Sequence, residues 1–150
     1  MDVMALYAGY KNMVYRLALS YLKSRADAED VTQQVFLRLL EYQGKISPGK
    51  ERSWLAAVTA NLCRDTLRSA ARRRTEPLGE ELVFQDEDQS GVFRAVMELG
   101  EQERAAVYLY YYEGYDTREI AQILKISRTA VTTRLSRARR HLREKLEEVS

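Results

Sequence analysis

The sequence predicts an all-α protein of two small helical domains joined by an acidic linker, the C-terminal domain being a helix-turn-helix. Only 7 glycines and 2 prolines occur in 150 residues, too few for an all-β fold, which needs a turn roughly every 8–12 residues. Apolar residues recur at intervals of three and four, as in amphipathic helices. Residues 76–92 carry six acidic side chains and no basic one. We therefore expect domains at residues 1–75 and 92–150 and a linker at residues 76–91.

The charge of the chain is unevenly distributed. The net charge is only +2, yet residues 1–75 hold 13 basic against 7 acidic side chains. Basic residues concentrate in two short stretches, residues 64–74 and residues 128–145. Such stretches are the electrostatic footprint of phosphate binding. A nearly neutral total therefore does not exclude a nucleic-acid partner.

Three helices are predicted in the N-terminal domain. The first spans residues 3–23, where apolar residues follow a helical period. The second has Asp27 as its N-cap and ends near Tyr42, and the third is capped by Ser53 and runs into the arginines at 72–74. The residues expected to face inward in the third helix are Trp54, Leu55, Val58, Leu62 and Leu67.

Helices resume in the C-terminal domain at residues 92–99 and 101–113. Gly114 is expected to end the second of these with a positive φ. Asp116 then caps a short helix, and Glu119 three residues later completes a capping box. The pattern predicts a helix that begins abruptly after a tight turn.

The last predicted helix follows a three-residue turn at 125–127 and is capped by Ser127. A left-handed Lys125 would cost roughly 1 kcal/mol, so we expect an adjusted turn instead. The helix has one aliphatic stripe, formed by Val131, Leu135, Ala138, Leu142, Leu146 and Val149. Its opposite face carries Thr129, Thr132, Thr133, Ser136, Arg137, Arg140 and Arg143. Hydroxyls and guanidiniums on one face are what a recognition helix needs to contact base edges and phosphates.

Other classes of function find little support in the sequence. The single cysteine, Cys63, excludes an internal disulfide, and the single histidine, His141, excludes a His-rich metal site. We expect no metal, no cofactor and no enzymatic activity, since no phosphate loop or nucleophile–base pair occurs. No apolar run approaches the roughly 18 residues of a membrane span, and the first residues lack a signal-peptide pattern. The expected location is the cytoplasm.

Three stretches together resemble a known family. Residues 27–36 read Asp-Ala-Glu-Asp-Val-Thr-Gln-Gln-Val-Phe, residues 60–65 read Ala-Asn-Leu-Cys-Arg-Asp, and residues 131–139 read Val-Thr-Thr-Arg-Leu-Ser-Arg-Ala-Arg. In this order and spacing they resemble the extracytoplasmic-function (ECF) subgroup of the bacterial sigma-70 family, the promoter-specificity subunits of RNA polymerase. The first stretch matches the subgroup's D-A-E-D-x-x-Q-x-x-F signature.

The resemblance implies a sigma factor that binds core RNA polymerase and directs promoter recognition and transcription initiation. Its partners would be core polymerase, double-stranded and locally melted promoter DNA, and an anti-sigma factor, without membrane insertion. The implied polymerase-binding residues are Asp27, Glu29, Asp30, Gln33, Gln34, Phe36 and Leu37. Those for the minus-ten element are Lys50, Arg52, Asn61, Arg64, Asp65 and Arg68. Those for the minus-thirty-five element are Arg128, Thr129, Thr132, Thr133, Ser136, Arg137 and Arg139.

Two other functions remain open from the residues alone. A stand-alone helix-turn-helix regulator that binds operators as a dimer would explain residues 116–145, but not the signature at residues 27–36. A protein-interaction module that only titrates polymerase or an inhibitor would explain the signature without requiring DNA contact. Binding to core polymerase, followed by promoter-specific transcription, separates the three.

Overall fold

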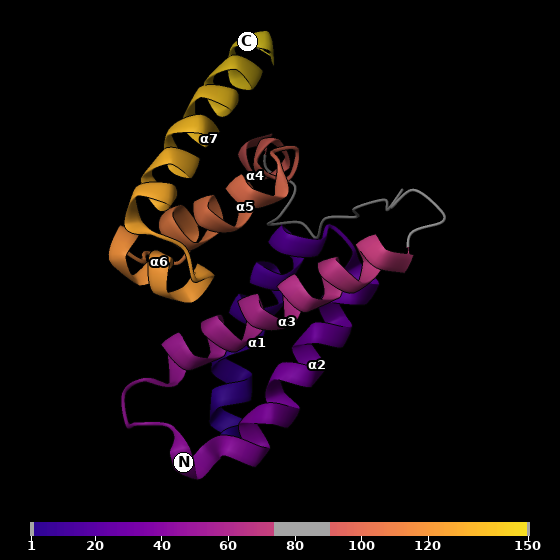
Figure 1. The fold of residues 1–150 in the computed structure, drawn as a ribbon, viewed down its shortest axis with the longest axis vertical. Coiled ribbons are helices and arrows are strands. Elements are labelled where there is room, and N and C mark those ends of the chain that lie inside the picture. Colours follow the sequence, from indigo (N-terminus) through magenta and orange to yellow (C-terminus); the bar gives the residue numbers. More distant parts are fainter. Residues whose placement is uncertain (1, 74–90, 150) are drawn as a thin grey trace. The chain divides into compact units, whose positions relative to one another are not determined.

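The computed structural model describes residues 2–73 and 91–149 (Figure 1), and within these ranges it contains seven α-helices and no β-strand. The all-α prediction is confirmed. Of the predicted acidic linker, residues 76–90 lie outside the described residues, whereas Gly91 already begins a helix. None of the described helices is both long and apolar enough to cross a lipid bilayer.

The first compact unit, Met1–Glu81, contains α1 (Val3–Leu22), α2 (Arg25–Tyr42), the short 3-10 helix η1 (Gln43–Lys45) and α3 (Glu51–Arg73). All three pairs of α-helices are in contact, and Figure 1 shows α1 lying against both of the others. Each helix turns one apolar face inward. The fully buried side chains include Val14, Leu17, Val31, Val35, Leu39 and Leu55. Burying one such side chain contributes about 1.5–3 kcal/mol, so this shared core holds the three helices together.

The caps of α2 and α3 differ from the prediction. Ser24, not Asp27, is the N-cap of α2, because the Asp27 amide donates a hydrogen bond to Ser24 Oγ at 3.2 Å. The reason is that Lys23 adopts a left-handed φ of 53° and reverses the chain within two residues. The predicted Asp27 cap is therefore wrong; its carboxylate lies in the first turn, where it favours the helix dipole. The predicted Ser53 cap is also wrong, since α3 already begins at Glu51.

The predicted inward face of α3 is buried in part. Leu55 and Leu62 are buried, whereas Trp54, Val58 and Leu67 are only partly so. The Trp54 ring lies 6.3 Å from that of Tyr42, an aromatic contact between the start of α3 and the end of α2.

The described part of the second compact unit, Leu82–Ser150, contains α4 (Gly91–Met97), α5 (Glu101–Val107), α6 (Thr117–Leu124) and α7 (Arg128–Val149). Figure 1 shows α7 as its longest element, with α4, α5 and α6 beside it. The core is formed by Val96, Ala106, Leu109, Ile120, Val131 and Leu135. The burial of one stripe of α7 against the shorter helices thus fixes which of its faces remains outside.

The predicted helix over residues 101–113 is α-helical only as far as Val107. From Tyr108 to Tyr112 it is a π-helix, labelled η3, in which the Glu113 amide donates to the Tyr108 carbonyl at 3.2 Å. The wider turn accompanies burial of the Tyr108 ring, whose hydroxyl donates to Glu113 Oε2 at 2.6 Å. π-Helical turns of this kind are rare and are enriched at functional sites.

Arg104 is a buried cation in this unit and secures the junction between α4 and α5. Its side chain is 6% exposed, and its Nη1 donates to the Leu99 carbonyl at 2.8 Å. Burial lowers the pKa of the Arg104 guanidinium, while the charge of Glu101 opposes the shift. A carbonyl left over at the end of one helix is thereby paired by a residue of the next.

The helix-turn-helix forms through the predicted caps. The Glu119 amide donates to Asp116 Oδ1 at 2.8 Å, and the Asp116 amide donates to Glu119 Oε1 at 2.9 Å, so the capping box is confirmed. Gly114 has the expected positive φ, 74°. Ser127 caps α7, since its Oγ accepts from the Ala130 amide at 3.0 Å. Sequence-local hydrogen bonds therefore set both helix starts.

Lys125 does adopt the left-handed conformation, with φ 57° and ψ 46°, so the expected adjusted turn is wrong. The left-handed residue allows the amides of Lys125 and Ile126 to bond the Ala121 carbonyl, the latter at 3.1 Å. This closes the end of α6 in the usual left-handed cap geometry. The hydrogen bonds and the packing of α6 on α7 offset the conformational cost of a non-glycine residue here.

Replacing Lys125 with glycine is expected to stabilise the second unit by up to about 1 kcal/mol, because glycine enters the left-handed region without a Cβ clash. Amide hydrogen exchange checks this, since protection in α6 and α7 should rise. Lys23→Gly, at the other left-handed non-glycine position, serves as the matched control and should protect amides of α1 and α2 instead. Unchanged or weaker protection of α6 and α7 in Lys125→Gly contradicts the account of the turn.

Candidate nucleic-acid interface

The first half of α7 presents a polar, basic face to solvent. Val131, Leu135 and Ala138 are buried beneath it, at 0–1% exposure. The exposed side chains of this face are Thr129, Thr132, Thr133, Ser136, Arg137 and Arg140. The underside fixes the rotation of the helix, so the short hydroxyls and the guanidiniums all point away from the core. A face of this width and composition fits the major groove of DNA.

Two side chains at the start of α7 already make hydrogen bonds within the unit. Arg128 Nε donates to Thr117 Oγ1 at 3.0 Å, which ties the first turn of α7 to the first turn of α6. Thr132 Oγ1 donates to the Thr129 carbonyl at 2.8 Å, so its hydroxyl proton is used within the helix. Thr132 therefore offers an acceptor oxygen and a methyl group on the exposed face. Neither bond could be predicted from the sequence pattern.

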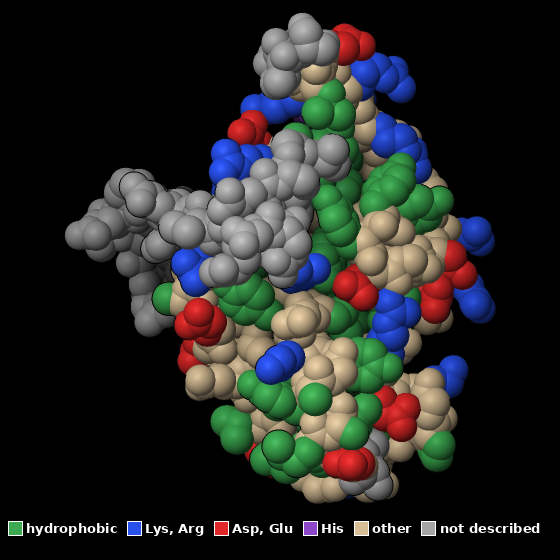
Figure 2. Space-filling model, turned by 180° about the vertical axis from the view of Figure 1, so that it is seen from behind, with side chains coloured by type: hydrophobic (Ala, Val, Ile, Leu, Met, Phe, Trp, Pro, Cys, Tyr) green, Lys and Arg blue, Asp and Glu red, His purple; other side chains and the backbone are tan. Residues whose placement is uncertain are grey.

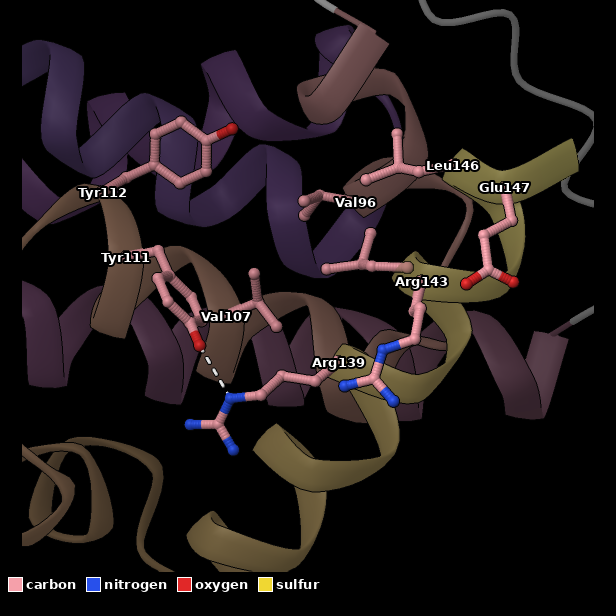
Figure 3. A pocket seen from close by; sticks show the side chains of 9 residues that line it. Val96, Val107, Tyr111, Tyr112, Arg139, Arg143, Leu146 and Glu147 are labelled. Atoms are coloured by element: carbon pink, nitrogen blue, oxygen red, sulfur yellow. Dashed lines mark hydrogen bonds between the residues drawn. The ribbon is translucent and has the colours of Figure 1, made fainter. Parts of the chain in front are cut away.

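Arg139 contacts the π-helical segment of the same unit. Its Nε donates to the Tyr111 hydroxyl at 2.7 Å, and its guanidinium carbon is 6.0 Å from the centre of that ring (Figure 3). Tyr111 belongs to the π-helical segment and is 51% exposed. The contact positions the guanidinium beside the helix and leaves its two terminal nitrogens as donors.

A hollow of about 620 Å³ lies along the second half of α7 (Figure 3). Its lining residues are Val96, Val107, Tyr111, Tyr112, Arg139, Leu142, Arg143, Leu146 and Glu147. Figure 2 shows a column of hydrophobic side chains along this helix with Lys and Arg side chains on either side. The predicted aliphatic stripe is therefore buried only in part: Leu142 is half-buried and Leu146 is 43% exposed, because the shorter helices end before α7 does. The side chain of Val149 lies outside the described residues.

Two polar pairs hold the second half of α7 on the rest of its unit. His141 Nδ1 lies 3.1 Å from Glu103 Oε2 of α5, and Lys145 Nζ pairs with Glu98 Oε2 just after α4. These contacts pair His141 and Lys145 of α7 with acidic side chains from other segments of the unit. Among the described residues, no group of His, Cys, Asp and Glu side chains is arranged to hold a metal ion.

The second predicted DNA-contacting surface lies on α3. Asn61 and Arg64 are partly buried there, and Asp65 and Arg68 are exposed. Asp65 and Arg68 form a solvent-exposed ion pair at 3.7 Å, which is worth little by itself. These four side chains occupy neighbouring turns and form one surface.

Lys50 and Arg52 lie at the other end of α3 from that surface. Arg52 is nine residues before Asn61 and sixteen before Arg68, about 14 Å and 24 Å along a helix that rises 1.5 Å per residue. Lys50 is exposed and Arg52 is partly so. These two residues therefore lie at least two helical turns from the Asn61 surface.

Arg64 connects Asn61 to α1. Its Nη2 donates to Asn61 Oδ1, and its Nη1 donates to the Tyr21 hydroxyl through a long hydrogen bond of 3.5 Å. Tyr21 is 8% exposed. The helical period identifies Tyr21 as a buried residue, but nothing in the sequence indicates that its hydroxyl meets an arginine 43 residues away.

The predicted partner-binding face on α2 is polar with one apolar centre. The exposed members are Asp27, Glu29, Asp30, Gln33, Gln34 and Leu37. Leu37 is 58% exposed, and Gln34 Nε2 donates to Asp30 Oδ2 at 2.7 Å. Phe36 is different, because it is only 7% exposed and packs edge-on against Tyr7 with ring centroids 4.9 Å apart. Phe36 thus supports this face from beneath.

Comparisons with known proteins agree across the chain. The family model described as Sigma-70 region 2 matches residues 6–73, and that described as Sigma-70, region 4 matches residues 92–142.

ECF RNA polymerase sigma factor SigL of Mycobacterium tuberculosis is 33% identical over 97% of this chain and 89% of its own length. ECF RNA polymerase sigma factor SigE of Mycolicibacterium smegmatis is 32% identical over 91% of this chain. The probable RNA polymerase sigma factor RfaY of Xanthomonas campestris pv. campestris is 31% identical over 91% of this chain. The chain spans 58% of SigE and 38% of RfaY.

Solved structures show the same fold. The sigma factor RpoE of Bartonella quintana, in complex with the anti-sigma factor NepR, superposes with a TM-score of 0.79 over 96% of both chains at 20% identity. CnrH, in complex with the cytosolic domain of CnrY, gives a TM-score of 0.68 over 99% of this chain and 89% of its own, at 23% identity.

Cys63 lies on α3 within the core and is fully buried. Burial raises the pKa of the Cys63 thiol, and the charge of Arg64 opposes the shift only in part. Because the thiolate is the reactive form, iodoacetamide at pH 8 should alkylate the native protein at least a hundredfold more slowly than the urea-unfolded chain. Mass spectrometry of timed samples measures the two rates. Equal rates would show that Cys63 is an accessible, reactive thiol.

Proposed function

Because the chain belongs to the sigma-70 family, among the extracytoplasmic-function RNA polymerase sigma factors, we propose that it binds core RNA polymerase and directs transcription initiation at specific promoters. It acts as a non-catalytic specificity subunit and works in the cytoplasm, where the polymerase is. The observation that carries the proposal is the presence of both a region 2 and a region 4 match in one chain. A stand-alone helix-turn-helix regulator would need only the second, so that alternative has less support.

In this proposal the second unit reads the minus-thirty-five element. The first half of α7 enters the major groove, where Thr133 and Ser136 contact base edges and Arg137 forms a bidentate bond, most favourably with guanine. Arg128 and Thr129 contact phosphates at the start of the helix. Arg139 contacts the backbone with the two nitrogens that Tyr111 leaves available. Thr132 contributes its methyl group and an acceptor oxygen.

The first unit has two roles in the proposal. The polar face of α2 binds core polymerase around Leu37, since an exposed apolar side chain within a polar rim is the usual composition of a protein interface. The Asn61 surface of α3 binds the minus-ten element once its strands separate, with Arg64 and Arg68 near phosphates and Asn61 at a base. Lys50 and Arg52 contact the strand farther along.

Two DNA-binding units of modest specificity on one chain fit this mode of action. A single small helix-turn-helix buries limited surface and discriminates modestly. When both units are anchored on polymerase, binding of one element raises the effective concentration of the other reader at its own element. The predicted acidic linker, residues 76–91, joins them. We also propose an anti-sigma factor as a partner, on the basis of the similar sigma factor RpoE, which was solved in complex with the anti-sigma factor NepR.

Arg137→Ala should weaken recognition of the minus-thirty-five element by roughly five- to a hundredfold, the range for losing one bidentate base contact. Its affinity for core polymerase should not change, because Arg137 lies on α7 and not on the α2 face. The affinity of reconstituted holoenzyme for promoter DNA, and that of the free subunit for core polymerase, measure the two effects separately.

Two further variants serve as controls for that experiment. Leu37→Ser should show the opposite pattern, with weaker binding to core polymerase and unchanged preference for the upstream element. Arg94→Ala removes an exposed positive charge from α4 of the same unit and should change neither. If Arg137→Ala weakens both interactions equally, the assignment of separate faces is wrong.

A further inference from the structure

The hollow along the second half of α7 is a largely apolar surface that the described part of the second unit leaves uncovered. Its volume of about 620 Å³ lies within the range of pockets that hold a ligand. Several of its lining side chains remain 43–51% exposed, namely Leu146, Tyr111 and Tyr112. The apolar floor consists of Val96 of α4, Val107 of α5, and Leu142 and Leu146 of α7. An exposed apolar surface of this kind marks a binding site.

The edge of the hollow carries more positive than negative charge. Arg139 and Arg143, one helical turn apart on α7, lie beside the apolar floor (Figure 3). Glu147 is the only acidic side chain among the described residues that line the hollow. Arg139 donates through Nε to the Tyr111 hydroxyl and keeps its two terminal nitrogens as donors. An occupant with apolar side chains in its middle and carboxylates on its flanks would complement this surface.

One segment of this chain has that composition. Residues 82–84 read Leu-Val-Phe, and they lie within the predicted acidic linker. Three acidic residues precede them and three follow them: Glu76, Glu80, Glu81, Asp86, Glu87 and Asp88. The segment itself lies outside the described residues. Its sequence therefore matches the hollow in both apolar character and charge.

The segment is close enough along the chain to reach the hollow. Phe84 is seven residues before Gly91, where α4 begins, and a chain of that length spans at most about 25 Å. Val96 lies five residues into α4, about 8 Å from its start. The lining residues of α7 extend from Arg139 to Glu147, about 12 Å along the helix. The apolar floor is thus within reach of a short tether, which gives the segment a high effective concentration there.

We propose that residues 82–84 dock in this hollow, with their side chains on the apolar floor and the neighbouring carboxylates beside Arg139 and Arg143. Burial of apolar surface supplies the driving force, and the opposite charges set the placement. The inference goes beyond the proposed function and does not depend on it, because it concerns the free chain. Any partner that binds the same hollow must first displace this segment.

Disulfide trapping in the full chain tests the docking, with Cys63→Ala in every variant to remove the native thiol. Gln85→Cys is combined with Leu146→Cys, at the wall of the hollow. The fraction oxidised in a glutathione buffer, measured by mass spectrometry, gives the effective concentration of the two thiols. In the matched control, Glu144→Cys replaces Leu146→Cys; residue 144 is two residues away, about 200° around α7, and does not line the hollow. The effective concentration should be roughly tenfold higher for the first pair than for the control.

Further substitutions in the background of Gln85→Cys and Leu146→Cys separate the apolar and the charged contributions. Phe84→Ser should lower the effective concentration to that of the control pair. Arg143→Gln should lower it roughly threefold, as expected for a partly exposed ion pair, whereas Arg118→Gln, which removes an exposed charge on α6, should not change it. Equal values for the two cysteine pairs, or no effect of Phe84→Ser, would overturn the inference. Disulfide-linked dimers as the main product would also overturn it and would assign the hollow to a second copy of the chain.

Discussion

The burial of Val131, Leu135 and Ala138 beneath α7 is the contact on which the proposed upstream reader depends. A helix has one face to bury, and the choice of that face decides what the other face presents. These three residues commit the underside to α5 and α6, so Thr133, Ser136 and Arg137 must face solvent. The same constraint acts on α2, where Val31, Val35 and Leu39 are buried and the acidic, amide-rich side is exposed. Each exposed surface is thus positioned by hydrophobic contacts on the reverse side of its helix.

Polar contacts between segments then orient individual arginine side chains on the surfaces that the hydrophobic packing leaves exposed. Arg139 is drawn toward Tyr111, Arg128 toward Thr117 and Arg64 toward Tyr21. In each pair an arginine that could contact phosphate or base is already held by a hydroxyl of another segment. Ordering a long, flexible side chain before it meets its partner lowers the entropy lost on binding. In the proposed function, the hydroxyl-bearing residues would therefore contribute to recognition by orienting these arginines.

The sequence predicted the elements well and their ends less well. Periodicity and the capping box around Asp116 are sequence-local, so the helices and the turn could be predicted from them. The choice between Ser24 and Asp27 as a cap depended on the left-handed Lys23, which caps the end of α1 and which the apolar pattern does not reveal. The left-handed Lys125 is stabilised by the amide bonds of Lys125 and Ile126 to the Ala121 carbonyl and by the packing of α6 on α7, which offset its conformational cost. The exposure of Leu146 follows from where the neighbouring helices end, which the pattern within α7 does not reveal. The sequence named Asn61, Arg64, Asp65 and Arg68 of α3, but the contact of Arg64 with Tyr21, 43 positions away, could not be predicted from a local pattern.

In the proposed function, one chain carries two DNA-binding surfaces and a polymerase-binding face that together confer promoter specificity. Run-off transcription tests this most directly, with purified protein and core RNA polymerase on genomic DNA fragments that hold upstream regions of the source organism. The account predicts discrete transcripts from particular fragments that require both components, together with a stable complex between the chain and core polymerase. Failure to bind core polymerase, combined with protection of a palindromic site by the protein alone, would contradict it and would favour a stand-alone regulator.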